Sequence, residues 1–222
     1  MRFLTGLLLA LLLAACGKPP VQVQEAFVFG TRVEVLVADA DVAKAKAATA
    51  TVLREFDRLH RTYHAWQPSE LTALNAAIAS GKTHPVTPEL AGFIADAQSM
   101  ATAGERLFDP GIGELVRLWG FHSEEFRAVL PDPAALAAWR AATPSILDLR
   151  VEDGRVSSAR RAVALDFGGY LKGVALDHAA AALRDAGVQN ALINIGGNVM
   201  ALGTKHGEPW RVGIQHPRQP GA

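Results

Sequence analysis

The sequence predicts an α+β fold, and three observations carry this prediction. Half of the 222 residues are hydrophobic and a fifth are charged, which suffices for a packed core and excludes wholesale disorder. Helical patterns dominate the first half of the chain, whereas strand patterns dominate the second half, with a single helix among the strands. The chain has no internal repeat and no low-complexity linker. We therefore expect a helix-rich first half packed on a mixed or antiparallel sheet.

The charge and cysteine content exclude several function classes. Lysine and arginine number 22 and exactly balance 22 acidic residues, so the chain lacks the basic excess of a typical nucleic-acid binder. A single cysteine excludes both a disulfide scaffold and a cysteine-rich zinc site. We expect no nucleic acid among the partners of this protein.

The first sixteen residues predict an export signal. A positively charged start precedes an apolar stretch from residue 3 to residue 15, which is shorter than the roughly 20 residues of a membrane-spanning helix. Leu13-Ala14-Ala15-Cys16 resembles the bacterial lipobox, in which the cysteine is lipid-modified; an ordinary signal with an accidental cysteine is the alternative. We expect lipidation at Cys16 to supply more than one acyl chain, which is the condition for stable anchoring.

The lipobox also predicts where the protein resides. A lipoprotein of this type faces the periplasm of a bacterial cell envelope, and Gly17 in place of Asp favours the outer membrane over the inner one. Residues 17–25 then form a polar tether outside the fold, and the folded domain spans residues 26–222.

The first half of the chain predicts one strand and five helices. Residues 26–37 alternate apolar and polar, with a bulge or tight turn at Gly30. Ser69 can cap one helix, and Thr87-Pro88 is a typical start for another. The helices are expected at 41–63, 69–79, 87–103, 110–119 and 132–142.

The second half predicts strands around one helix. Residues 147–151 alternate, and Asp153-Gly154 is a hairpin turn from which a second strand returns at residue 155. A helix is expected at 173–186, ended by a glycine. Further strands are expected at 162–167, 191–195, 199–202 and 210–214.

A glycine pair at a predicted strand-to-helix junction indicates an anion site. In the segment from Asp166 to Gly173, free backbone amides and the positive end of a helix would face the ligand, and Lys172 adds a full charge. Asp166 could hold a metal or a polar ligand group. The alternative is a tight turn with a solvated lysine. The segment matches neither the P-loop nor the dinucleotide fingerprint.

A second glycine pair repeats this arrangement. Gly196-Gly197 follows Asn194 at the end of another predicted strand. Two such pairs, each flanked by a carboxylate or carboxamide, fit a phosphate-bearing ligand that the backbone approaches closely. The alternative is a pair of β-bulges or hairpin turns.

Aromatic residues gather in two other segments. The segment 108–113 leads into Trp119-Gly120-Phe121, whose rings could stack on a planar ligand or belong to the core, and Asp109 before Pro110 could cap a helix. A polar-aromatic cluster lies between two predicted helices and contains Tyr63, His64, Trp66, Ser69, Glu70 and Asn75. The histidines of the chain do not combine the paired spacing of a zincin with its acidic partner, and the glycine-serine elbow of a serine hydrolase is absent from the sequence.

Taken together and in order, these segments resemble the ApbE family, the FAD:protein FMN transferases. The series begins at Phe29-Gly30-Thr31, continues through the four segments described above and closes with residues 210–214. The resemblance implies an ApbE-like, T-fold-like architecture. It also implies that FAD binds with a divalent cation, usually Mg²⁺, and that a Thr or Ser hydroxyl of an acceptor flavoprotein attacks the FMN phosphorus and releases AMP.

The resemblance assigns site residues by position. Lys172 and Asp166 are the implied catalytic residues, and the backbone carbonyl of Leu171 is an implied metal ligand. The implied cofactor-binding residues are Phe29, Gly30, Tyr63, Trp66, Leu107, Phe108, Asp109, Gly168, Gly169, Lys172, Asp177, Gly196 and Gly197.

The chain departs from the family pattern at three places. Tyr170-Leu171 replaces Ile-Ala before Lys172, Asn198 replaces an aspartate after the second glycine pair, and both Tyr63 and Trp66 fit the position of one family aromatic. Relatives continue past the length of this chain with the remaining metal ligands, so we expect a C-terminally truncated domain with an incomplete sheet. The alternatives to a transferase are an FAD-binding or FAD-hydrolysing lipoprotein and an inactive anchored fragment.

Overall fold

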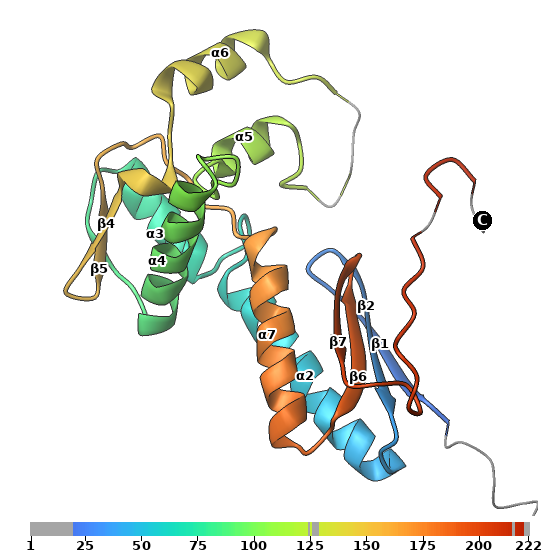
Figure 1. Ribbon diagram of the computed structural model, residues 1–222. Helices are drawn as coiled ribbons and strands as arrows, with labels where there is room; N and C mark the ends of the chain where they lie inside the picture. Colours follow the sequence, from blue (N-terminus) through green and yellow to red (C-terminus); the bar gives the residue numbers. More distant parts are fainter. Residues whose placement is uncertain (1–19, 124, 126–128, 215, 220–222) are drawn as a thin grey trace, which may run out of the picture. The chain divides into compact units, whose positions relative to one another are not determined.

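The computed structural model describes residues 20–123, 125, 129–214 and 216–219 (Figure 1). Cys16 and the predicted export signal lie outside these residues. The chain divides into two compact units. The terminal unit joins the described residues up to Arg54 with those from Leu176 onward, and the central unit comprises Glu55–Ala175.

The terminal unit contains an open, antiparallel four-stranded sheet with the order β1-β2-β6-β7. Its strands are β1 (Gln22–Val28), β2 (Thr31–Ala38), β6 (Asn190–Ile195) and β7 (Asn198–Leu202). The predicted strand at 26–37 is thus two strands joined by a turn at Phe29-Gly30. Because β1 begins at Gln22, residues 22–25 belong to the sheet, and the predicted tether boundary was placed too late.

Alternation decides which face of this sheet is buried. Val33, Val35 and Val37 on β2 are buried beside Ile193 and Ile195 on β6, with Val35 paired to Ile193. Helices α2 (Val42–Thr62) and α7 (Tyr170–Asp185) contribute residues 42–54 and 176–185 to this unit, where they cover the buried face (Figure 1).

The predicted strand at 210–214 does not form. These residues pair with no strand among those that the structure describes, and Ile214 is 96% exposed. Trp210 instead donates a hydrogen bond from its indole Nε1 to the carbonyl of Leu202, at 3.0 Å. An alternating pattern is not sufficient for a strand, because a strand also needs a neighbour that pairs with its backbone.

The central unit is mainly helical. Besides parts of α2 and α7 it contains α3 (Glu70–Ala79), α4 (Pro88–Ala103), α5 (Gly113–Leu118) and α6 (Pro133–Ala142). A small sheet has the order β3-β5-β4, with β3 at His84–Pro85, β4 at Leu149–Glu152 and β5 at Arg155–Ser158. The short 3₁₀ helix η1 (Ile146–Asp148) replaces the start of one predicted strand.

Three helices in this unit begin where the sequence predicted. The Ser69 hydroxyl accepts a hydrogen bond from the amide of Thr72, and Thr87 caps α4 directly before Pro88. Asp132 caps α6 in the same way. By contrast, α7 begins at Tyr170, three residues before the predicted start, so Lys172 lies in its first turn.

The segment 162–167 does not form the predicted strand, although its apolar residues are buried. Its alternate residues Val163, Leu165 and Phe167 are all buried. The side chain of Asn75 makes both backbone bonds to Leu165: its Nδ2 donates to the carbonyl at 2.9 Å, and its Oδ1 accepts from the amide at 2.8 Å. The Asn75 side chain and a single parallel bridge between Ile112 and Ala164 therefore take the place of a full neighbouring strand, and the alternation of the sequence cannot distinguish these cases.

No helix among the described residues combines the length and the apolar character that crossing a membrane would require.

Candidate functional site

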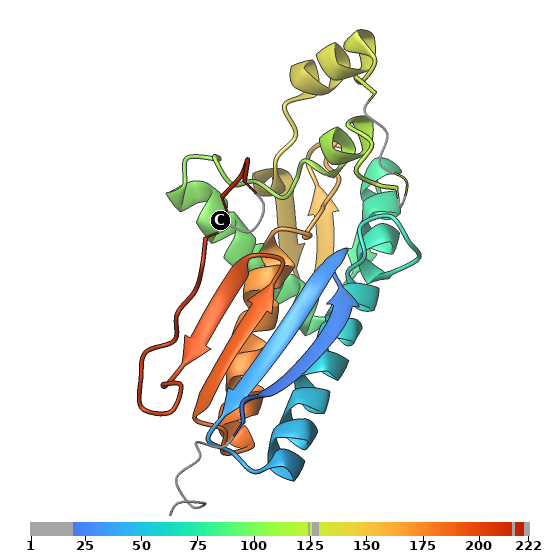
Figure 2. The ribbon, with the colours of Figure 1, turned by 90° about the vertical axis from the view of Figure 1, so that its right-hand side faces the viewer.

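Four predicted residues meet at one end of the terminal unit's sheet. The turns Phe29-Gly30 and Gly196-Gly197 lie side by side, because β6 runs antiparallel to β2 and the amide of Gly196 donates to the carbonyl of Arg32 at 3.1 Å (Figure 2). Phe29 and Gly30 both have left-handed backbones, with φ of 56° and 68°. Such values suit the tight two-residue turns of hairpins.

The Gly196-Gly197 amides are occupied by the chain itself. Besides the bond of Gly196 to Arg32, the Gly197 amide donates to Asn194 Oδ1 at 2.9 Å, and Asn194 Nδ2 donates to Glu34 at 3.2 Å. This pair is therefore the hairpin turn of the alternative prediction. A ligand at this end of the sheet would have to use groups other than these two amides.

In the central unit, Asp166 is held from both sides. Its Oδ1 accepts a hydrogen bond from the Gly168 amide at 2.8 Å, and its Oδ2 accepts one from His122 Nε2 at 2.9 Å. The two side chains are only 13% and 11% exposed, respectively. His122 was not among the predicted residues. It follows the aromatic stretch that the sequence singled out, but no spacing rule links it to an aspartate 44 residues later.

His122 also stacks on Trp66. The ring centroids are 5.0 Å apart and the planes differ by 23°. The His64 ring packs edge-on against Trp66, with 4.3 Å between the ring centroids. His64 Nδ1 also accepts hydrogen bonds from the backbone amides of Trp66 and Gln67. Trp66 as a whole remains 43% exposed. It therefore has a fixed orientation and an open surface.

Tyr63, the other aromatic candidate, has a different environment. Its ring is buried and packs edge-on against Phe93, at 5.2 Å between centroids. Its hydroxyl donates to the Glu89 carboxylate, which also pairs with Arg58. Tyr63 is thus part of the core, and Trp66 is the candidate that presents a ring surface.

The charge on Asp166 is stabilised despite its burial. Burial by itself would raise the pKa of this carboxyl group. The hydrogen bonds from His122 and the Gly168 amide, together with the charges of His122 and His64, outweigh that effect and lower the pKa below its ordinary value. Asp166 is therefore a carboxylate at neutral pH. Burial lowers the pKa of neighbouring His60, which favours its neutral form.

The start of α7 is the predicted anion site. Gly168 and Gly169 precede the helix, and the Gly169 amide has no hydrogen-bond partner among the described residues. Lys172, partly buried, is the third residue of the helix. An uncommitted amide, a helix N-terminus and a lysine together favour a phosphate group. Asp177 lies five residues beyond Lys172, about 140° around the helix, so these two do not share a face.

The described residues around Leu171 supply only part of the ligand set of a divalent cation. Leu171 is the second residue of α7, and its carbonyl lies in the first turn of that helix. Each oxygen of Asp166 accepts one hydrogen bond and keeps a further lone pair. Mg²⁺ prefers near-octahedral oxygen coordination, so Asp166 and the Leu171 carbonyl could contribute to a cation site but would not complete it.

Asp109 has a structural role. Its Oδ1 accepts hydrogen bonds from the amides of Gly111 and Ile146, both at 2.9 Å, and its Oδ2 accepts one from Ser145 Oγ at 2.6 Å. Asp109 does not cap α5, whose N-cap residue is Ile112, so that expectation was wrong. Nearby, Phe108 is partly buried, whereas Leu107 is 96% exposed and offers an apolar contact to a ligand.

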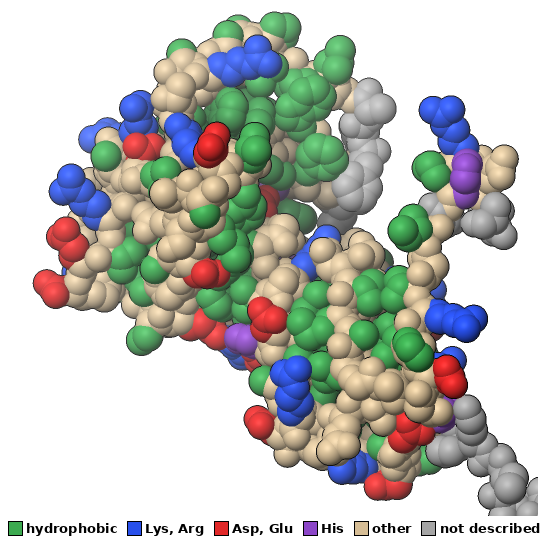
Figure 3. Space-filling view, viewed as in Figure 1, with side chains coloured by type: hydrophobic (Ala, Val, Ile, Leu, Met, Phe, Trp, Pro, Cys, Tyr) green, Lys and Arg blue, Asp and Glu red, His purple; other side chains and the backbone are tan. Residues whose placement is uncertain are grey.

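Of the two alternatives for the aromatics after Asp109, the structure contradicts the one that places Trp119 and Phe121 in the core. Trp119 and Phe121 are largely exposed, as are Val129 and Leu130 before α6. Figure 3 shows hydrophobic surface over α5 and α6. This part of the central unit thus offers apolar surface to a ligand or partner.

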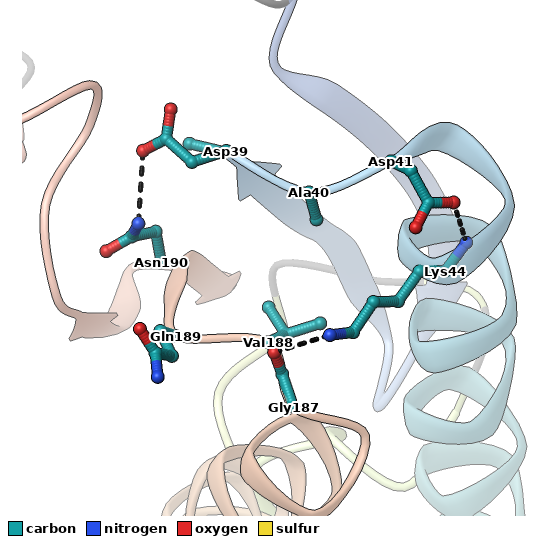
Figure 4. Close-up of a pocket in the computed structure, with 9 residues that line it drawn as sticks. Asp39, Ala40, Asp41, Lys44, Gly187, Val188, Gln189 and Asn190 are labelled. Carbon is teal, nitrogen blue, oxygen red and sulfur yellow. Dashed lines mark hydrogen bonds between the residues drawn. The ribbon is translucent and has the colours of Figure 1, made fainter.

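A polar cavity of about 280 Å³ lies at the far end of the terminal unit's sheet from the glycine turns (Figure 4). Its polar groups bond to one another: Lys44 Nζ donates to the Gly187 carbonyl at 2.8 Å, and Asn190 donates to Asp39 at 3.0 Å. Asp39 also pairs with His206 at 2.7 Å. No predicted site residue lines this cavity, and its contacts fasten the ends of the secondary-structure elements.

Comparisons with known proteins agree on one family. A model of the ApbE family matches residues 29–222. The FAD:protein FMN transferase of Rhodobacter capsulatus is 40% identical over 222 residues, covering 97% of this chain and 42% of that protein. The Haemophilus influenzae FAD:protein FMN transferase is 28% identical over 223 residues, covering 96% and 64%. The chain thus spans roughly half the length of these relatives.

Solved structures show the same fold. The ApbE protein of Thermotoga maritima superposes with a TM-score of 0.81 at 24% identity, covering 90% of this chain and 65% of that chain. A mutant of the flavin transferase ApbE from Vibrio cholerae gives 0.78 at 25% identity, covering 90% and 68%.

Proposed function

Because this chain belongs to the ApbE family, we propose that it acts as an FAD:protein FMN transferase. The acceptor is a flavoprotein that carries the modified Thr or Ser. The hydroxyl oxygen forms a bond to the FMN phosphorus, the bond from that phosphorus to the AMP oxygen breaks, and AMP leaves with the electron pair. The hydroxyl proton passes to a base. The names of the matched relatives and the ordered motifs support this proposal.

One observation in the central unit carries the proposal. An oriented, open indole at Trp66 and an anion-attracting helix start at Lys172 lie in the same compact unit. FAD has a flat ring system and a pyrophosphate, so it needs both kinds of surface. Trp66 binds a ring by stacking. Lys172 and the Gly169 amide stabilise negative charge on the phosphates, including the charge that develops as AMP departs.

The resemblance also implies a divalent cation. When bound, such a cation polarises the pyrophosphate and stabilises the leaving phosphate. Asp166 and the Leu171 carbonyl would supply only part of its coordination, so the cation would need further oxygen ligands. The assay therefore treats magnesium as a variable.

The decisive experiment incubates the purified chain with FAD and an acceptor protein, with and without Mg²⁺. The matched control is the same acceptor with its target Thr replaced by Val. We expect covalent flavin on the acceptor, seen as fluorescence in a denaturing gel, and an equal amount of AMP. Release of AMP and free FMN with either acceptor would identify an FAD hydrolase instead. No AMP under any condition, with FAD still bound, would indicate a flavin-binding protein.

We also propose that the protein is anchored to the membrane through Cys16. The support is the sequence alone: a lone cysteine at the lipobox position. Cys16→Ser should abolish incorporation of labelled palmitate and release the protein from the membrane fraction. An uncleaved signal in the variant would be visible as an increase in size. Absence of label from the wild type would contradict the proposal.

A further inference from the structure

His122 contacts two residues with different chemistry. Its Nε2 donates to the Asp166 carboxylate at 2.9 Å, while its ring lies nearly parallel to Trp66 at 5.0 Å. An ionised carboxylate is only an acceptor, so the proton of this hydrogen bond belongs to the imidazole. One rigid ring therefore connects the carboxylate to the indole.

Each of these two residues depends on His122 for one of its constraints. The first oxygen of Asp166 is held by the Gly168 amide, and His122 holds the second. The Trp66 ring packs edge-on against His64 and stacks face-to-face on His122. Without His122, the carboxylate could rotate about its remaining hydrogen bond and the indole could tilt.

The surroundings favour a strong connection. His122 and Asp166 are almost buried, and a charged hydrogen bond is less screened there than at the surface. Trp66 nevertheless keeps much of its ring exposed. The arrangement is rigid on the protein side and open on the ligand side, which lowers the entropy lost when a ligand binds.

Resting on the function proposed above, we propose that His122 is a positioning residue that fixes the Trp66 ring relative to the Asp166 carboxylate. The ligand that this geometry suits has a flat ring and a nearby hydrogen-bond donor, as the flavin part of FAD has. The ring stacks on Trp66, while an N–H or O–H of the same ligand donates to Asp166. His122 itself makes neither contact and acts through these two residues.

The first test needs no ligand. Protein labelled with 5-fluorotryptophan gives a fluorine NMR signal for Trp66, assigned with Trp66→Phe, and the signals of Trp139 and Trp210 serve as internal controls. We expect Asp166→Asn to shift the Trp66 signal when His122 is present and to leave it unchanged in His122→Ala. If His122→Ala does not fold, His122→Leu takes its place. Equal shifts in both backgrounds, or a shift in neither, would overturn the proposal.

The second test separates the two contacts in the binding of FAD. His122→Phe keeps a flat ring but no donor, and His122→Gln keeps a donor but no flat ring. We expect FAD to bind about tenfold more weakly to His122→Phe, with quenching of its flavin fluorescence retained. We expect about threefold weaker binding to His122→Gln, with reduced quenching. His84→Gln, a histidine outside this cluster, is the matched control.

The outcomes distinguish the inference from the function on which it rests. Wild-type affinity in either His122 variant would mean that one contact suffices, and the joint role would be wrong. Failure of the wild-type chain to bind FAD would remove the proposed function and the ligand part of this inference. The fluorine signal of the unliganded protein would then still decide whether His122 couples Trp66 to Asp166.

Discussion

Two glycine pairs that look alike in the sequence have different roles in the two units. In the terminal unit, Gly196-Gly197 forms a hairpin turn whose amides both bond to the chain. In the central unit, Gly168-Gly169 precedes a helix, and the Gly169 amide has no partner among the described residues. An anion can be bound only by amides that the fold has not already used.

The backbone requires glycine in one pair but not in the other. Gly196 and Gly197 have φ of 55° and 96°, in the region that residues with a Cβ rarely adopt. Neither Gly168 nor Gly169 is among the residues with positive φ. A Cβ on Gly169 would meet no atom within 4 Å. Glycine is required at Gly196-Gly197 by the turn, whereas at Gly169 the fold leaves open space that a ligand can approach.

The largest expected effect follows from this difference. Gly196→Ala should lower the free energy of unfolding by about 2–3 kcal/mol, because a left-handed alanine is strained and its Cβ would lie 2.5 Å from Thr31 Oγ1. Urea titration measures this change. Gly197→Ala, which is strained but meets no neighbour within 4 Å, is the matched control and should cost less. Equal losses would mean that the contact with Thr31 is unimportant.

The next effect concerns binding rather than stability. Lys172→Ala should weaken binding of FAD and AMP about tenfold and leave riboflavin binding unchanged, because only the first two carry phosphate. Isothermal titration calorimetry with the three ligands measures this. Lys82→Ala, which removes an exposed lysine elsewhere in the central unit, should change none of them. A similar loss for riboflavin would place Lys172 away from the phosphates.

The polar side chains that bond to the two glycine pairs, Asp166 and Asn194, should also differ in their response to acid. The lowered pKa of Asp166 means that its stabilising effect is fully present above the ordinary pKa of an aspartate, and is lost as the pH falls through the lowered value. Asn194, which holds the second pair, does not titrate. Unfolding free energies measured from about pH 7 to about pH 3 should therefore fall less steeply for Asp166→Asn than for the wild type. Parallel curves would show that Asp166 carries no such linkage.

The smallest expected change in stability is at Gly169. Gly169→Ala should leave the unfolding free energy within about 0.5 kcal/mol of the wild type, since the site has room for a Cβ and needs no positive φ. The same variant should bind FAD more weakly if the ligand approaches this backbone. A folded variant with unchanged affinity would contradict the anion site at this pair.

The sequence predicted most elements because their signals are local. Capping at Ser69, Thr87 and Asp132 depends on residues next to each helix, and these starts were confirmed. The errors arose where the structure depends on a distant partner. Residues 162–167 have a strand pattern, but the side chain of Asn75 bonds to them. Residues 210–214 alternate without a strand to pair with.

The same reason limited the prediction of the site. Asp166 and the helix that follows it share one segment, so their junction could be predicted from that segment alone. His122 could not, because its relation to Asp166 exists only after folding. The environment of Gly196-Gly197 also depends on Arg32, far away in the chain. The element that follows each pair does distinguish them: helix α7 follows Gly168-Gly169, and strand β7 follows Gly196-Gly197.

The bond between Asn75 and Leu165 sets the Leu165 amide apart from its neighbour, because the Asp166 amide donates instead to the backbone carbonyl of Pro110, at 2.9 Å. The Leu165 amide is protected by a side chain and not by a sheet, so it can exchange with solvent deuterium whenever that one carboxamide moves away. The amides of β2 and β6 exchange only when their ladder opens. The hydrogen-exchange rate of the Leu165 amide thus reports local opening beside Asp166, independently of global unfolding. A ligand that lowered this rate, and left the exchange rates of the β2 and β6 amides unchanged, would stabilise the segment next to Asp166 without stabilising the sheet.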